Sequence, residues 1–186
     1  MPEPSSQETF ASFGRNILMD YSTADFIIRC KTRKFQVHKT ILCARSPVLR
    51  ATILSDMKEA KKGEIFVEEI DEKTMESIII FIYTGDFNLG KDPDVLMFAW
   101  AGHKYLLPGF MELLCFKIRE ERTTGEMISD LLISAHLHDS KDLKEVAMEK
   151  IKDNRGLLKE EGFKKAMKEV DSTVGLNIML DLVKDL

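Results

Sequence analysis

Four histidines, at positions 38, 103, 136 and 138, are the side chains of this sequence best suited to acid–base chemistry or zinc binding. His38 is expected at the end of a strand and His103 on an apolar helix. His136 and His138 are two residues apart on a predicted helix and point to different faces, whereas zinc-binding histidines on a helix need a spacing of about three or four residues. We therefore predict a structural role for each histidine.

No other group of residues has the spacing of a catalytic or cofactor site. Glu68 and Glu69 alternate between the faces of a predicted strand, whereas catalytic carboxylate pairs converge on one substrate bond. Ser46 directly precedes Pro47 and is explained as a helix N-cap. The glycines do not cluster into a phosphate-binding loop. The sequence thus predicts a non-catalytic protein that needs no cofactor and no metal.

The cysteines, the net charge and the absence of long apolar runs indicate the compartment and the partners of such a protein. Cys30, Cys43 and Cys115 lie among apolar neighbours without metal-binding spacing, so we expect reduced core residues of a nuclear or cytoplasmic protein. The net charge of −4 argues against nucleic-acid binding. No apolar run approaches the roughly 20 residues that span a bilayer, and the start of the chain is polar, so we expect neither a membrane partner nor a signal peptide.

The first two thirds of the chain are predicted to contain both strands and helices, and these elements must position any functional site. Residues 1–9 are expected to be disordered, and residues 10–18 have helical spacing. Two β-rich runs, residues 26–30 and 35–38, flank a short basic turn and predict a hairpin. Short helices follow around residues 41–44 and 47–54, and residues 64–70 alternate as a strand.

Helices are expected from there to the end. Asp71 is expected to cap a buried helix that Gly85 ends. Asp92 and Pro93 open the next helix, and Pro108 opens another. Everything after Thr123 is predicted to be helical, over residues 126–138, 141–153, 161–170 and 174–186. Residues 10–122 therefore form one α+β domain, and residues 123–186 form an all-helical region packed against it.

Several separated motifs resemble the BTB/POZ domain in order. They are ADFIIRC, FQVHKTILCARSPVLRATI, IFIYTG and AGHKYLLPGFMELLCFKI, within about residues 10–122. The resemblance implies the BTB/POZ fold, a small sheet flanked by helices. The later ISDLLISAHLHDSKDLKEVAMEKI resembles the helical cullin-binding box and truncated BACK region of the speckle-type POZ protein-like MATH–BTB family of ubiquitin-ligase substrate adaptors. No MATH domain fits before Phe10, so substrates would bind through a MATH domain outside this chain.

The resemblance implies cullin-3 as a partner. The family's hydrophobic-x-Glu motif reads Met57-Lys58-Glu59 here, with Met57 as an anchor and Glu59 fixing register at the rim. The alternative is that Met57 folds back over its own helix end. Further cullin-binding candidates are Tyr83, Tyr105, Leu107, Pro108, Leu132 and Leu137. For Tyr105, Leu132 and Leu137, burial in the core is the alternative.

The resemblance also implies a homodimer. Its interface would use the N-terminal helix and the first core helix, at Phe10, Phe13, Ile17 and Ile41. Asp25 and Lys39 match the paired charges of the BTB dimer-face pocket, and the simpler interpretation is a partly buried ion pair that orients the fold.

A second self-association surface is expected on the last helix, which is apolar around much of its circumference, at Ile178, Met179 and Leu182. It would link dimers into higher oligomers. The alternative is simple packing onto the preceding helices.

The function implied is that of a substrate-adaptor module of a cullin-3 RING E3 ubiquitin ligase, in the ubiquitin conjugation pathway. The alternative is a BTB transcriptional regulator that recruits corepressors through the dimer groove. A small enzyme would need a convergent polar site, which the sequence does not contain.

Overall fold

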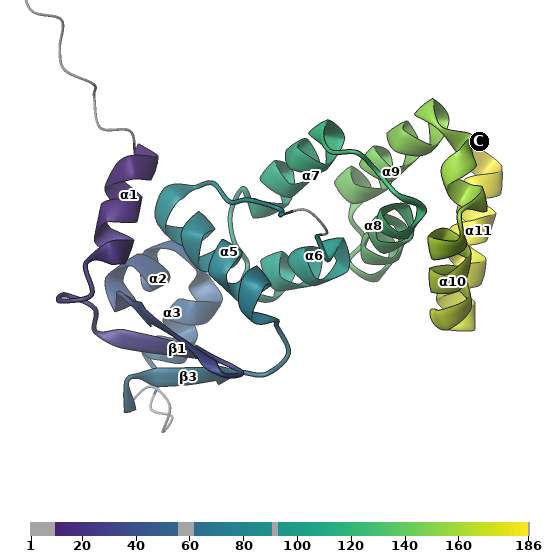
Figure 1. The fold of residues 1–186 in the computed structure, drawn as a ribbon. Helices are drawn as coiled ribbons and strands as arrows, with labels where there is room; N and C mark the ends of the chain where they lie inside the picture. Colours follow the sequence, from purple (N-terminus) through teal and green to yellow (C-terminus); the bar gives the residue numbers. More distant parts are fainter. Residues whose placement is uncertain (1–9, 56–61, 91–92, 186) are drawn as a thin grey trace, which may run out of the picture. The chain divides into compact units, whose positions relative to one another are not determined.

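The computed structural model describes residues 10–55, 62–90 and 93–185, which form an α+β fold (Figure 1). The predicted disorder of residues 1–9 lies outside these residues. The strands are β1 (Phe26–Cys30), β2 (Arg33–Val37) and β3 (Glu64–Val67). The helices are α1 (Phe10–Met19), α2 (Lys39–Arg45), α3 (Pro47–Ile53), α5 (Glu72–Thr84), α6 (Val95–Lys104), α7 (Phe110–Glu120), α8 (Gly125–Leu137), α9 (Lys141–Asp153), α10 (Glu161–Glu169) and α11 (Ser172–Asp185), with a 3-10 turn at Arg155–Lys159. A small sheet flanked by helices and followed by a helical region is the predicted fold class, which is confirmed.

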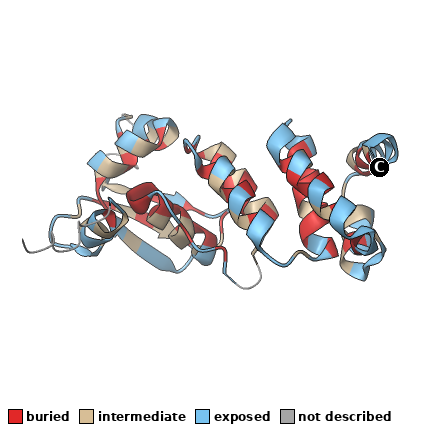
Figure 2. Cartoon of the chain, turned by 90° about the horizontal axis from the view of Figure 1, so that it is seen from above, coloured by how far each residue is buried: buried red, intermediate tan, exposed pale blue. Residues whose placement is uncertain are grey.

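The chain forms two compact units. The first contains Met1–Gly90 and Lys104–Phe110, and the second contains Lys91–His103 and Met111–Leu186. The sheet with α1, α2, α3 and α5 belongs to the first unit, and α8 to α11 belong to the second. In both, buried residues, red in Figure 2, gather along one side of most helices. The predicted domain boundary after residue 122 stays a prediction.

The sheet has the order β2-β1-β3, with β1 antiparallel to β2 and parallel to β3. One face of it is buried, because Ile28 and Cys30 of β1 and Val67 of β3 are each at most 4% exposed. On β3 the intervening Phe66 is 53% exposed. This alternation with period two explains why the sheet is covered on one face only.

Capping residues set the ends of the helices in the first unit. Ser46 Oγ accepts a hydrogen bond from the N–H of Leu49 at 3.1 Å, so it caps α3 as predicted. Asp71 caps α5 by accepting from two backbone N–H groups at 2.9 and 3.1 Å. Gly85 ends α5 with φ of 74°, in the left-handed region that glycine tolerates. The predicted start and end of this buried helix are therefore confirmed.

The helical unit is organised around α8, which is buried along most of its length and contacts α9, α10 and α11. α9 has the predicted bounds, and the residues of its apolar stripe are all fully buried: Leu143, Val146, Ala147 and Ile151. α11 begins two residues earlier than predicted because Asp171 Oδ1 accepts hydrogen bonds from the N–H groups of Thr173 and Val174.

Two further helix starts differ from the prediction. α6 begins at Val95 rather than at Asp92, because the acceptor that caps it is Asp94, whose Oδ1 accepts from the N–H of Met97 at 2.8 Å. α7 begins at Phe110, since Gly109 has φ of 74° and forms a turn after Pro108.

Candidate functional site

The predicted docking motif follows α3, which ends at Ile53, and precedes β3, which begins at Glu64. Met57 and Glu59 lie outside the described residues, so the motif stays a prediction. The last described residues before it include Leu54, whose side chain is 68% exposed. The end of α3 therefore lies at the protein surface.

The other predicted docking residues of the first unit divide between core and surface. Tyr83 is buried, and its hydroxyl oxygen accepts a hydrogen bond from the backbone N–H of His38 at 2.7 Å while lying 2.8 Å from His38 Nδ1. Burial raises the pKa of Tyr83 to about 12. Tyr105 and Leu107 are also buried, and the carbonyl of Tyr105 accepts from Ser46 Oγ at 2.6 Å. The prediction that these three side chains contact a partner is corrected, because they pack the interior.

Pro108, by contrast, is exposed, as predicted for a contact residue. Leu106, two residues earlier in the same turn, is 57% exposed and has φ of 47°. A leucine held in the left-handed region at a turn is uncommon. The turn at residues 106–108 therefore presents two apolar side chains on the surface of the first unit.

In the helical unit, the two predicted docking residues also have different surroundings. Leu132 is 5% exposed and belongs to the buried side of α8, so its prediction as a contact residue is corrected. Leu137, the last residue of α8, is 58% exposed and available to a partner.

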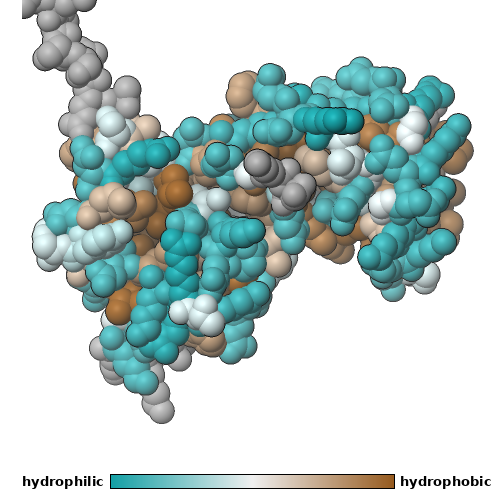
Figure 3. Space-filling model, in the orientation of Figure 1, coloured by the Kyte–Doolittle hydropathy of each residue, from teal (hydrophilic) through white to brown (hydrophobic). Residues whose placement is uncertain are grey.

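The predicted dimer residues come together around one small cavity. Phe10, Phe13 and Ile17 of α1 and Ile41 of α2 all line a cavity of about 170 Å³. The side chain of Phe10 is 67% exposed and that of Phe13 is 52% exposed. Hydrophobic side chains reach the surface beside α1 in Figure 3. The sequence therefore located a clustered, partly exposed apolar surface, which we call the α1 face.

Two residues of this region were missed by the sequence analysis. Arg45 lines the same cavity with its Nε buried and without a hydrogen-bond partner among the described residues, and its guanidinium lies 5.3 Å from the ring centroid of Phe81. Gly14 lies where α1 packs on α5, and a Cβ added there would fall on the backbone carbonyl of Tyr83. A lone glycine inside an amphipathic helix was the available signal for this close approach.

Asp25 and Lys39 are in contact, but not as the ion pair that the sequence suggested. Asp25 Oδ1 accepts a hydrogen bond from the backbone N–H of Lys39 at 2.8 Å, at the first residue of α2. The ammonium of Lys39 lies instead 5.8 Å from the ring centroid of Phe26. The Asp25 carboxylate therefore caps α2 from outside that helix, and the residue is exposed.

The exposed apolar surface of α11 lies mostly on a different side of the helix from the predicted self-association surface. Ile178 and Leu182 are 3% and 5% exposed, so they belong to the core, and their prediction as self-association residues is corrected. Met179 is 40% exposed. The exposed apolar side chains of α11 have i, i+3, i+4, i+7 spacing and form a stripe at Leu176, Met179, Leu180 and Val183.

His103 and His138 pack against each other. The rings of His103 and His138 stack with centroids 4.1 Å apart, and each Nε2 is buried without a partner among the described residues. Burial lowers the pKa of both imidazoles. Within the described residues, no three His, Cys, Asp or Glu side chains are placed to hold a metal ion.

The cysteines are free thiols, of which Cys30 and Cys115 are buried and Cys43 is half-buried. Burial raises the pKa of Cys115 to about 11 and also raises that of Cys30. A thiol that keeps its proton is a poor nucleophile. No helix in the described part of the chain is long and apolar enough to cross a membrane.

One acidic hollow of the helical unit was not expected. A cavity of about 670 Å³ is lined by the carboxylates of Asp94, Glu126, Asp130 and Glu160 and by Arg122. Glu160 Oε2 accepts a hydrogen bond from the N–H of Gly125 at 2.6 Å. Burial raises the pKa of Asp130 to about 7, and the nearby carboxylates of Asp94 and Glu126 add to the effect.

The chain is similar to known proteins over its first two thirds. The family model described as "BTB/POZ domain" matches residues 16–122. Kelch-like protein 40a of Danio rerio is 34% identical over 110 residues, which is 58% of this chain and 18% of that protein. Among solved structures, the BTB domain of zebrafish PATZ1 matches with a TM-score of 0.50 and 18% identity, covering 64% of this chain and 100% of that one. The BTB domain of human gigaxonin matches with a TM-score of 0.46 and 21% identity, covering 62% and 98%.

Proposed function

This chain belongs to the BTB/POZ family, and we propose that it is a substrate-adaptor module of a cullin-3 RING E3 ubiquitin ligase. The observation that carries the proposal is a BTB/POZ domain continued in the same chain by the helices α8 to α11. An adaptor needs both parts, since the helical region would extend the cullin contact beyond the BTB/POZ domain. Assignment to the speckle-type POZ protein-like MATH–BTB branch rests on the sequence resemblance.

Cullin-3 would bind the first unit through the segment after α3. Met57 would be the anchor that enters an apolar pocket of the cullin, and Glu59 would fix register at the rim. The exposed Leu106 and Pro108 suit additional apolar contact. On the helical unit, the exposed Leu137 is the residue we assign to this partner.

A homodimer would form through the α1 face. Phe10 and Phe13 are exposed, and a two-fold interface places the same patch of both subunits in contact, so each copy would cover the other's aromatic side chains. A second contact through the exposed stripe at Leu176, Met179, Leu180 and Val183 would link dimers into higher oligomers.

The mechanism is scaffolding in the nucleus, the cytoplasm or both. A dimeric adaptor holds two cullin-bound catalytic arms, and a substrate reader outside this chain, such as a MATH domain, would raise the effective concentration of ligase at the target. Ubiquitin transfer would be performed by enzymes that the cullin carries. The chain itself would make and break no bond.

The transcriptional alternative is not favoured. It requires a corepressor site across Asp25 and Lys39, but the Asp25 carboxylate already accepts the backbone N–H of Lys39 and caps α2. It also gives no role to the helices after Thr124.

The decisive experiment is a titration of this chain with the N-terminal region of cullin-3. Met57→Ala should raise the Kd roughly thirtyfold, because truncating an interface anchor costs on the order of 2 kcal/mol. The matched control is Met19→Ala, which removes an equally long side chain that is 67% exposed at the end of α1. It should leave the Kd unchanged. An unaltered Kd for Met57→Ala, or no binding by the unmodified chain, would contradict the proposal.

A further inference from the structure

A groove runs along the outer edge of the sheet. It has a volume of about 490 Å³ and is walled by the end of α1, by β2 and by α5. Four consecutive residues of β2, Arg33 to Gln36, line it. Because successive side chains of a strand point to opposite faces, a groove over one face would contact only alternate residues. Contact with all four residues means that the groove follows the edge of β2.

That edge has no strand beside it in the described sheet, since β2 is the outer strand in the order β2-β1-β3. The backbone groups on this side of β2 therefore have no ladder partner within the described sheet. An edge strand next to a groove is the arrangement in which an extended peptide can be added as a further strand.

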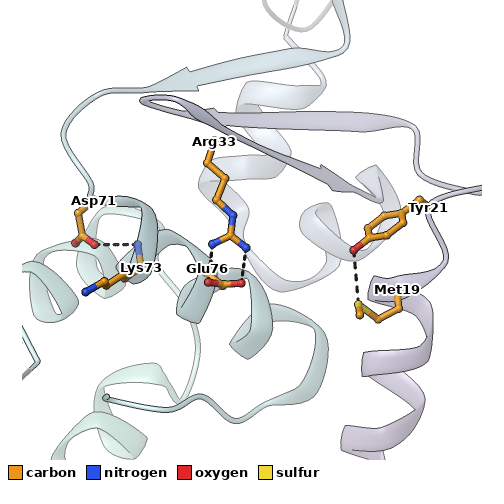
Figure 4. Close-up of polar contacts among 6 residues, drawn as sticks. All are labelled: Met19, Tyr21, Arg33, Asp71, Lys73 and Glu76. Atoms are coloured by element: carbon orange, nitrogen blue, oxygen red, sulfur yellow. Dashed lines mark hydrogen bonds and ion pairs between the residues drawn. The ribbon is translucent and has the colours of Figure 1, made fainter. Parts of the chain in front are cut away.

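The groove is positively charged. Arg33 donates hydrogen bonds to both carboxylate oxygens of Glu76 at 2.7 and 2.6 Å, as drawn in Figure 4, so these two charges neutralise each other. Arg15 and Lys34 also line the groove and are exposed. Among the described residues neither has a carboxylate partner. Two positive charges are thus left for an acidic ligand.

The rest of the lining is largely apolar. Ile80 of α5, Leu18 of α1 and Phe35 of β2 are half-buried, and the exposed side chains of Met19 and Tyr21 extend the wall, with the Tyr21 hydroxyl directed at the Met19 sulfur (Figure 4). A ligand strand with alternating acidic and apolar side chains would meet both kinds of surface, because its side chains alternate between two faces.

We propose that this groove binds an extended segment of a partner protein, with alternating acidic and apolar residues, as a fourth strand on the edge of β2. The main chain of the segment would pair with β2, and its carboxylates would pair with Arg15 and Lys34. None of the residues of the α1 face and none of the described cullin-binding candidates line this groove, so the site uses other described residues than the dimer and cullin contacts proposed above.

The proposal is tested with the full chain and three kinds of labelled octapeptide. An octapeptide of alternating glutamate and valine should bind saturably in fluorescence anisotropy and shift the amide resonances of residues 33–36. The same peptide with lysine in place of glutamate should not bind. Two further glutamate–valine peptides carry N-methyl groups on the odd or on the even residues. Only one edge of an added strand faces β2, so one of these peptides should bind about tenfold more weakly than the other.

Variants of the chain locate the charge contacts. Lys34→Glu and Arg15→Glu should each weaken binding about tenfold, since each replaces an attraction with a repulsion. Lys73→Glu makes the same charge change on α5 at a residue that does not line the groove, and it should bind as the unmodified chain does. Absence of binding, equal affinity for both N-methylated peptides, or equal weakening by Lys73→Glu would overturn the proposal. The charges of β2 would then serve only to keep its edge from pairing.

Discussion

Asp130 is a side chain of the helical unit whose pKa changes on folding. Its carboxyl shares the acidic hollow with Asp94 and Glu126, and its pKa is raised to about 7 from 3.8 by burial and by those two charges. The folded state therefore binds a proton more tightly than the unfolded state does. The stabilisation from this proton is fully present below about pH 3.8 and is lost as the pH rises through about 7.

Asp130→Asn should abolish this loss. At pH 8 the variant should have a free energy of unfolding on the order of 2 kcal/mol higher than that of the unmodified chain, and at pH 5 the difference should be smaller. Fluorescence of Trp100, the single tryptophan, reports unfolding of the unit that contains Asp130. Asp142→Asn, which removes an exposed carboxylate on α9, is the control for the loss of one negative charge from this unit. Equal effects of Asp130→Asn at both pH values would refute the assignment.

At the scale of residues, helix-capping roles could be predicted from the sequence more accurately than contacts between distant residues. Ser46, Asp71 and Gly85 act within a few residues of themselves, so their capping roles could be predicted from spacing alone. The hydrogen bonding of the Tyr83 hydroxyl could not, because its partner His38 lies 45 residues away in the sequence. The same holds for the acidic hollow, which joins residues from three separate segments.

At the scale of elements, α1 is held against α5 by a close backbone approach at Gly14. A methyl group at this position would fall on the backbone carbonyl of Tyr83, and neither backbone segment can move without shifting its helix. The amphipathic pattern of α1 predicted that it packs on something, but not that it approaches so closely.

Gly14→Ala should therefore displace α1 although alanine is the better helix former. We expect a loss of roughly 1–3 kcal/mol in the free energy of unfolding, as for other overpacked sites. Hydrogen exchange should show lost protection for the amides of α1, with α5 still protected. The control is Gly175→Ala in α11, where the nearest heavy atom to the added methyl is a Val170 methyl group at 3.3 Å. Unchanged protection of α1 in Gly14→Ala would contradict the packing argument.

The first and last residues of a helix could be predicted where a capping residue directly precedes a regular apolar pattern. α9 agrees with its prediction because Ser140 caps it, accepting from the N–H of Leu143, and its apolar stripe is regular. The face that α11 buries was not predictable, because apolar residues surround much of that helix. Contact with α8, which lies some 40 residues earlier, selects Ile178 and Leu182 for the core.

At the scale of the whole molecule, the exposed aromatic side chains of α1 favour the proposed homodimer. Phe10 and Phe13 follow helical spacing with Ile17, yet the first two remain more than half exposed beside a small apolar cavity. Large exposed aromatics contribute little to folding and much to association, because burying them against a partner removes apolar surface from water. A second copy of the chain presents the same surface and can cover both.

Phe13→Asp combined with Ile17→Lys should therefore give a monomer in size-exclusion chromatography with light scattering, whereas the unmodified chain should elute as a dimer. The pair adds one charge of each sign, so the net charge is unchanged, and burying either charged side chain in an apolar two-fold contact carries a large desolvation cost. The control is Met19→Asp. Met19 lies on α1 but lines the groove along the edge of β2 and not the α1 face, so this variant should remain dimeric. A dimer that persists in the double variant would place the interface elsewhere. A monomeric unmodified chain would leave Phe10 and Phe13 exposed for a different partner.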